Sequence, residues 1–154
     1  MAGKIESRLK NLKIELPEAA APVANFVPCV QAGNILFVSG QVTAWNGEYK
    51  FIGKVGKDFA AEQAREAARL CALNILAQVK AHLGDLDRVK RVCQVHGLVN
   101  AVADFKDHPK VVNGASDLFV EVFGEAGKHA RFAVGAGSLP LNVAVEVAAI
   151  LEVA

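Results

Sequence analysis

The chain has 154 residues, 17 of them basic and 16 acidic, so its formal net charge is only +1 with histidine neutral. A chain of this length is expected to bury one core, and a nearly neutral chain lacks the positive field that attracts nucleic acid or an anionic membrane. No segment approaches the roughly 20 apolar residues that span a bilayer, and the N-terminus has no signal-peptide pattern. Cys29, Cys71 and Cys93 lie far apart, which is typical of buried thiols in a reducing cytosol. We therefore expect one cytoplasmic domain over residues 1–154, without a membrane or nucleic-acid partner.

Short elements are expected in the first third of the chain. Apolar residues recur at helical spacing from Ile5 to Leu16, and Pro17 stops the pattern. This predicts a helix over 4–15 within an N-terminal helical extension of residues 1–20. A connector follows, and turn signals then separate short β-branched runs. The expected elements are a hairpin of 27–30 and 35–38, an extended piece over 39–44, a turn at Asn46-Gly47 and a strand over 49–52.

The rest of the chain predicts two long helices and three strands. A helix is predicted over 59–82, with Asp58 as its cap and Gly84 at its end. One alanine-rich apolar stripe on this helix should pack closely on a sheet; the stripe is Ala60, Ala64, Ala67, Cys71, Ile75 and Val79. Pro109 begins a second helix, which Gly124 closes. Strands are expected over 89–102, 131–137 and 143–152. This order favours an α+β fold with both helices on one face of a mixed sheet.

The last two strands are expected to pair as a hairpin, and alternation then divides their side chains between two faces. One face, packed against the helices, would carry Phe132, Val134, Ala136, Val143, Val145, Val147 and Leu151. The other would carry Arg131, Ala133, Gly135, Gly137, Ala144, Glu146, Ala148 and Ile150. Glycines inside a strand often mark the close approach of a ligand or of another backbone. The pattern therefore predicts that Arg131 and Glu146 project to the same side, into an open hollow.

The residues alone leave two interpretations of this face open. In the first, Arg131 and Glu146 form an ordinary ion pair and the small residues pack against another subunit. In the second, the planar guanidinium binds a substrate carboxylate through two parallel hydrogen bonds, while Glu146 handles a water molecule or a proton.

Three motifs resemble those of the RidA/YjgF family of reactive intermediate (enamine/imine) deaminases, whose older labels are translation inhibitor and endoribonuclease L-PSP. The motifs are GNILFVSGQ at 33–41, VVNGASDLF at 111–119, and the run from Ala130 to Val147 with its Ala-Arg, Leu-Pro and V-x-V-E-V segments. The resemblance implies a chorismate-mutase-like α+β fold. It also implies a homotrimer with three ligand clefts between subunits, and it favours the carboxylate interpretation of Arg131.

The resemblance also implies roles for single residues. Arg131 matches the arginine that binds the substrate carboxylate, and Glu146 matches the glutamate associated with the attacking water. Ser39 and Asn113 match polar positions that line the cleft. Phe26 stands where the family often has tyrosine, and Ala133 replaces a frequent cysteine, a position expected to act through its main-chain N–H.

Other departures indicate a divergent branch of the family. Gly137 and Ser138 replace a more usual Ala-Arg pair, the segment from Val89 to Asn113 is longer than in typical members, and the N-terminal helix is additional.

Other chemistries have little support in the sequence. No histidine is placed beside Ser39 to activate it as a nucleophile, and the four histidines form no metal-ligand pair. Gly135-x-Gly137 lacks the strand-to-helix context of a dinucleotide loop. We therefore expect neither a metal nor a cofactor.

Three functions follow from these observations. The first is a hydrolytic deaminase of small 2-imino or enamino acids, which gives a 2-keto acid and ammonia. The second is a trimeric module that binds or senses a small carboxylate without turnover, suggested by the missing cysteine and tyrosine. The third, ribonuclease activity, lacks a basic patch, an aromatic RNA platform and a histidine pair.

Overall fold

The computed structural model of the protein describes residues 3–154. Its helices are α1 (Lys4–Asn11), α2 (Ala61–Leu83) and α3 (His108–Phe123). Its strands are β1 (Cys29–Ala32), β2 (Ile35–Gln41), β3 (Ala44–Trp45), β4 (Glu48–Tyr49), β5 (Val89–Asn100), β6 (Ala130–Ala136) and β7 (Val145–Val153). Among these described residues, none of the helices has the length and apolarity needed to cross a membrane.

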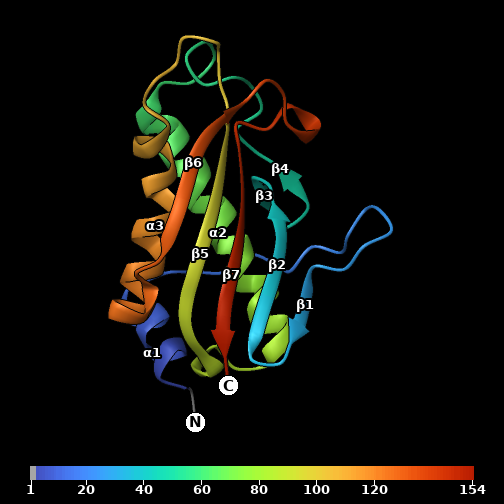
Figure 1. The fold of residues 1–154 in the computed structure, drawn as a ribbon, viewed down its shortest axis with the longest axis vertical. Coiled ribbons are helices and arrows are strands. Elements are labelled where there is room, and N and C mark those ends of the chain that lie inside the picture. Colours follow the sequence, from blue (N-terminus) through green and yellow to red (C-terminus); the bar gives the residue numbers. More distant parts are fainter. Residues whose placement is uncertain (1–2) are drawn as a thin grey trace.

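Five strands form one mixed sheet in the order β1-β2-β7-β5-β6, and β3 and β4 form a separate small hairpin. β6 runs parallel to β5, whereas the other neighbours in the large sheet are antiparallel. Figure 1 shows α2 and α3 side by side on one face of this sheet. The predicted α+β architecture, with two main helices on one face of a mixed sheet, is confirmed.

Helix α2 closely follows its prediction. Ala64, Ala67, Cys71, Ile75 and Val79 are fully buried against the sheet, and Gly84 ends the helix with a φ of 81°. The start differs: the helix begins after an exposed Ala60, whose N–H donates to Gln63 Oε1 at 2.9 Å. The predicted cap, Asp58, instead accepts a hydrogen bond from the Lys54 N–H at 2.8 Å, because the chain turns between them.

Several other elements are shorter than predicted. Helix α1 ends at Asn11 rather than 15, since Lys13 adopts a left-handed φ of 57° that no helix continues. β4 stops at Tyr49 because Phe51 also has a positive φ, of 52°. Asn46 and Gly47 form the predicted turn with φ values of 49° and 89°, and β1 and β2 form the predicted hairpin.

The predicted pairing of the last two strands is wrong, because β5 lies between β6 and β7. The faces of β7 are as predicted: Val145, Val147 and Leu151 are buried under the helices, and Glu146 lies on the other face. The faces of β6 are the reverse of the prediction. Phe132 and Val134 are 41% and 44% exposed on the face away from the helices, where the Phe132 ring stacks on His96 at a centroid distance of 4.7 Å.

Candidate functional site

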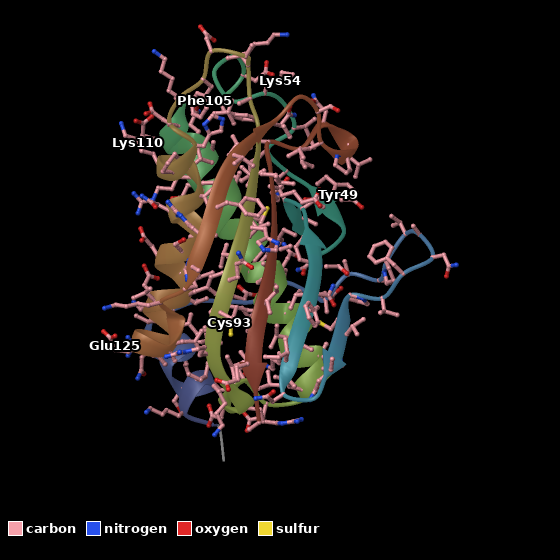
Figure 2. All side chains as sticks on the ribbon, in the orientation of Figure 1. Tyr49, Lys54, Cys93, Phe105, Lys110 and Glu125 are labelled. Atoms are coloured by element: carbon pink, nitrogen blue, oxygen red, sulfur yellow. The ribbon has the colours of Figure 1, made fainter. Side chains whose placement is uncertain are left out.

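A cavity of about 250 Å³ opens beside Glu146, next to the end of β2. Its walls come from distant parts of the chain: the connector before β1, the end of β2, the β3–β4 hairpin, α2 and the turn after β6. Phe26, Tyr49 and Leu141 contribute large apolar or aromatic surfaces. Figure 2 shows Tyr49 on β4, on the side of the molecule away from α3. Phe26 and Glu146, both predicted as site residues, therefore line one cavity.

A β-bulge places the Glu146 carboxyl group in this cavity. The register between β2 and β7 shifts between Val38 and Gln41, so Ser39 and Gly40 lie at an irregularity in the pairing. Gly40 packs directly on Glu146: a Cβ atom at Gly40 would lie 2.2 Å from Glu146 Oε2. Glycine at position 40 therefore leaves room for the Glu146 carboxyl group in this position, which a side chain would displace.

Burial raises the pKa of Glu146 above its ordinary value of 4.5, because the apolar surroundings disfavour the ionised form. A carboxyl group with a raised pKa holds and releases a proton closer to neutral pH than an exposed glutamate does. Such a group is suited to general base or acid chemistry.

Ser39 has a structural contact rather than a place in the cavity wall. Its hydroxyl donates to the Val27 carbonyl at 2.8 Å, and its N–H donates to the Pro28 carbonyl at 2.8 Å. Both bonds hold the connector, and with it Phe26, against the bulge. Ser39 thus supports the cavity wall without lining the cavity.

Arg131 lies in a second polar cluster, between β6 and α3. Its Nη1 donates to Ser116 Oγ at 2.9 Å and its Nη2 donates to the Pro109 carbonyl at 3.3 Å. Two of the five guanidinium N–H groups are used in this way, which leaves three for a ligand.

His129 completes this cluster. Its Nδ1 lies 2.6 Å from the Gly127 carbonyl and its Nε2 lies 2.8 Å from Ser116 Oγ. A carbonyl only accepts, so the proton is on Nδ1 and the Ser116 hydroxyl donates to Nε2. Desolvation first, and the nearby Arg131 charge second, lower the pKa of His129, which keeps the ring neutral at physiological pH. The bonds from His129 to Ser116 and from Ser116 to Arg131 fix the position of the guanidinium.

Asn113 and Ala133 belong to the same region as Arg131. Asn113 is on α3, one turn after Pro109, and is half-buried. Ala133 is on the helix-facing side of β6, two residues after Arg131, and packs on the core. The six predicted site residues therefore form two groups: Phe26, Ser39 and Glu146 near the cavity, and Arg131, Asn113 and Ala133 between β6 and α3.

The two groups lie on opposite faces of the sheet, so the prediction that Arg131 and Glu146 project to the same side is wrong. Glu146 lies opposite Leu98 in the register of the sheet, and Leu98 lies opposite Val134; these three residues are on the face away from the helices. Arg131 lies opposite the buried Val95. From strand spacing and rise, their Cα atoms are separated by about 10 Å across the sheet and about 10 Å along it. An ion pair between them within one chain is excluded, and so is a site formed by both within one chain.

Two of the thiols lie in surroundings that disfavour the thiolate. Burial raises the pKa of Cys29 to about 11, and burial and the nearby Glu146 raise that of Cys71 well above its ordinary value. Both thiols are therefore protonated and unreactive at neutral pH. Within residues 3–154, no group of three or more His, Cys, Asp or Glu side chains is arranged to hold a metal ion.

Comparison with known proteins identifies the family. Residues 6–153 match the sequence profile described as "YjgF/chorismate_mutase-like, putative endoribonuclease". The chain belongs to this family. A curated relative, Protein TCP17 of Trypanosoma cruzi, is 45% identical over 152 residues, which cover 98% of this chain and 95% of TCP17.

Two solved structures are similar to this YjgF-like chain along almost its whole length. Atu1372 of Agrobacterium tumefaciens, described as of unknown function, is 49% identical with a TM-score of 0.91, over 97% of this chain and 92% of that one. A putative endoribonuclease of Shewanella oneidensis is 37% identical with a TM-score of 0.94, over 98% of this chain and 100% of that one. The resemblance predicted from the three motifs is confirmed.

In this YjgF-like chain the three motifs correspond to the two residue groups. GNILFVSGQ forms β2 and its bulge against Glu146, and VVNGASDLF forms the turns of α3 beside Arg131. The run from Ala130 to Val147 contributes Glu146 to the first group and Arg131 and Ala133 to the second. The motifs alone therefore identify the elements of the site, although they do not show on which face of the sheet each lies.

Sequence reasoning missed three residues of the site. Gly40 belongs to the GNILFVSGQ motif, but its contact with Glu146 depends on the bulge, which has no clear sequence signal. Ser116 and His129 meet through the packing of α3 on β6. A signal was available for His129, which directly precedes the Ala-Arg segment.

Proposed function

We propose that the protein is a hydrolytic deaminase of 2-imino or enamino acids that acts in clefts between the subunits of a homotrimer. One observation carries this proposal: the Glu146 carboxyl group is half-buried in an open, mostly apolar cavity and has a raised pKa. A carboxylate in such a place is suited to orient and deprotonate a water molecule.

Glu146 would act as the general base in this reaction. Water attacks the carbon of the protonated imine and loses one proton to Glu146, while the π electrons of the C=N bond move to nitrogen and leave a C–N single bond. Glu146 returns this proton to nitrogen, which becomes a leaving ammonium group. As the C–N bond breaks, the hydroxyl group gives its proton to Glu146 and forms the C=O bond, so a 2-keto acid and ammonia leave. Imines of this kind also hydrolyse spontaneously, so orientation and charge placement supply the modest lowering of the barrier that is needed.

Arg131 would bind the substrate carboxylate from a neighbouring subunit. Because Arg131 and Glu146 of one chain lie on opposite faces of the sheet, only two chains together bring them to the same substrate. Arg131 has three free N–H donors for a carboxylate. The main-chain N–H of Ala133 would add a further donor, and Asn113 a polar wall.

A module that binds a small carboxylate without turnover is the second candidate. Ala133 supports it, because its methyl group packs on the core and leaves no polar side chain at the position where the family often has cysteine. Endoribonuclease activity, which the descriptions of the family and of the Shewanella protein name, is not proposed for this chain. An apolar cavity with one acidic group disfavours phosphates, and a net charge of only +1 supplies no strong attraction for them.

An imine-trapping assay separates the candidates. A dehydratase generates 2-aminoacrylate or 2-aminocrotonate, and the release of keto acid is followed with and without the protein. Faster release that is lost in Arg131→Ala and in Glu146→Gln supports the deaminase. Binding of 2-ketobutyrate without any acceleration supports the binding module and would exclude the enzyme.

A further inference from the structure

The cavity beside Glu146 has a mostly apolar wall and a single anionic group; the amides of Gln41, Asn74 and Gln78 also line it, and each donates to a main-chain carbonyl. Val23, Phe26, Val42 and Leu141 line it with hydrocarbon surface, and Ala44 forms part of its wall at β3. No lysine, arginine or histidine belongs to its described lining. A substrate carboxylate would be repelled from such a place, and an apolar group would be favoured there.

The cavity is larger than the smallest 2-imino acids need. Its volume is about 250 Å³, whereas an apolar cavity of about 150 Å³ already accommodates benzene. A methyl or ethyl side chain would leave most of the wall without contacts, and unfilled apolar space forfeits dispersion contacts. The dimensions suit a branched aliphatic or an aromatic group.

We infer that this cavity receives the substrate side chain and that the preferred substrates carry a large apolar side chain, branched aliphatic or aromatic. This inference rests on the proposed function. The reacting carbon lies at the mouth of the cavity beside Glu146, and the cationic form of the imine nitrogen faces that carboxylate. The substrate carboxylate then points out of the cavity, toward Arg131 of the neighbouring subunit.

The wild-type protein provides the first test. An amino acid oxidase with catalase converts alanine, leucine and phenylalanine into their 2-imino acids, and semicarbazide traps the imine that remains. In pockets that fit their substrate, one methylene changes kcat/KM by about 10- to 200-fold. We expect kcat/KM for the imines of leucine or phenylalanine to exceed that for the imine of alanine by at least about 10-fold.

A variant that fills the cavity provides the second test. Ala44→Leu replaces a methyl group by an isobutyl group in the cavity wall, at a buried position of β3. It should lower kcat/KM for the large imines about 10-fold or more and leave that for the alanine imine nearly unchanged. Ala103→Leu, the same substitution at an exposed site in the loop after β5, is the matched control. If thermal melting shows that Ala44→Leu does not fold, Ala21→Phe fills the cavity from its exposed rim.

Binding separates failure of this inference from failure of the proposed function. Calorimetric titration should show tighter binding of 3-phenylpyruvate than of pyruvate, and Ala44→Leu should weaken only the former. This result would support the assignment of the cavity to a large apolar side chain. If no imine were hydrolysed at the same time, only the deaminase activity would be excluded. Hydrolysis of the alanine imine at a rate equal to or above that of the larger imines would overturn the inference and leave the deaminase intact.

Discussion

At the scale of single residues, Glu146 illustrates how function and stability oppose each other. Its carboxyl group is partly desolvated, which raises its pKa and suits it to proton transfer. The same desolvation disfavours the charged form in the folded protein relative to the unfolded chain. The folded state is therefore favoured where Glu146 is protonated. This stabilisation is fully present below the ordinary pKa of 4.5 and is lost as the pH rises through the higher pKa that Glu146 has in the folded protein.

Glu146→Gln should therefore lower activity and raise stability at neutral pH. Loss of a general base lowers kcat by about 100- to 10,000-fold. The melting temperature of the variant should exceed that of the wild type at pH 7, and the difference should shrink at pH 4, where Glu146 is protonated. Glu152→Gln, on the same face of β7, is the control and should show neither effect. A variant that melts below the wild type at both pH values would contradict the assignment of a desolvated carboxylate.

Ser116 is the second residue with a clear test, since it holds Arg131 in place. Ser116→Ala removes the acceptor of the Arg131 Nη1–H and the donor to His129 Nε2. The guanidinium becomes mobile, so KM should rise about 10-fold while kcat changes little, because the loss of one hydrogen bond to a charged group costs about 1.5 kcal/mol or more. Ser116→Thr should restore KM, and Asp117→Ala, one residue along α3, should leave it unchanged. An unaltered KM in Ser116→Ala would show that the cluster is only structural.

At the scale of elements, the sequence predicts the helices well because their signals are local. The apolar stripe of α2, Pro109 at the start of α3, and the glycines that end both helices depend only on neighbours within a few residues. The pairing of β6 is a long-range property and was predicted wrongly. Consecutive strands usually pair, but β6 instead runs parallel to β5. Bulky Phe132 and Val134 then lie on the exposed face, so the larger residues of an alternating strand do not identify the buried face.

The contact between α2 and α3 gives a prediction with an unusual sign. Glycine to alanine inside a helix normally stabilises by about 1 kcal/mol. At Gly114, however, a Cβ would lie 1.9 Å from the Arg65 carbonyl oxygen, so the helices would have to separate. Gly114→Ala should destabilise the fold by about 1–3 kcal/mol, measured by urea denaturation. Gly137→Ala, where a Cβ meets nothing within 4 Å, is the control. Unchanged stability in Gly114→Ala would disprove this close packing.

The bulge in β2 gives the second prediction at this scale. Gly40→Ala would push a methyl group into the Glu146 carboxylate, so activity should fall about 100-fold or more, as for a displaced general base. The melting temperature should change little, because Gly40 is exposed and its side chain would meet only a movable carboxylate. Gly137→Ala again serves as the control. Retained activity would show that Glu146 does not act from the position it has over the bulge.

At the scale of the whole molecule, no helix of residues 3–154 covers one face of the sheet. Phe37, Phe132 and Val134 are 46%, 41% and 44% exposed there, and Figure 1 shows both long helices on the opposite face. Phe132 and Val134 are neighbours on this face of β6, and exposed apolar patches often mark protein interfaces. In the proposed homotrimer, neighbouring chains would cover this face and each cleft would join two of them.

Mixing two inactive variants tests this arrangement directly. Arg131→Ala and Glu146→Gln should each be nearly inactive alone. In a cyclic trimer each cleft takes Arg131 from one chain and Glu146 from the next. A cleft is therefore intact only where the chain that supplies Arg131 is the Glu146→Gln variant and the chain that supplies Glu146 is the Arg131→Ala variant. After random exchange of equal amounts, about one quarter of the clefts are intact, and the mixture should recover about one quarter of the wild-type kcat. Native mass spectrometry confirms that mixed trimers have formed, and a mixture of Arg131→Ala with Arg131→Lys is the control that recovers nothing. If mixed trimers form without any recovery of activity, Arg131 and Glu146 of neighbouring chains do not share a cleft. Random exchange would otherwise produce intact clefts, whichever of the two neighbouring chains supplied Arg131.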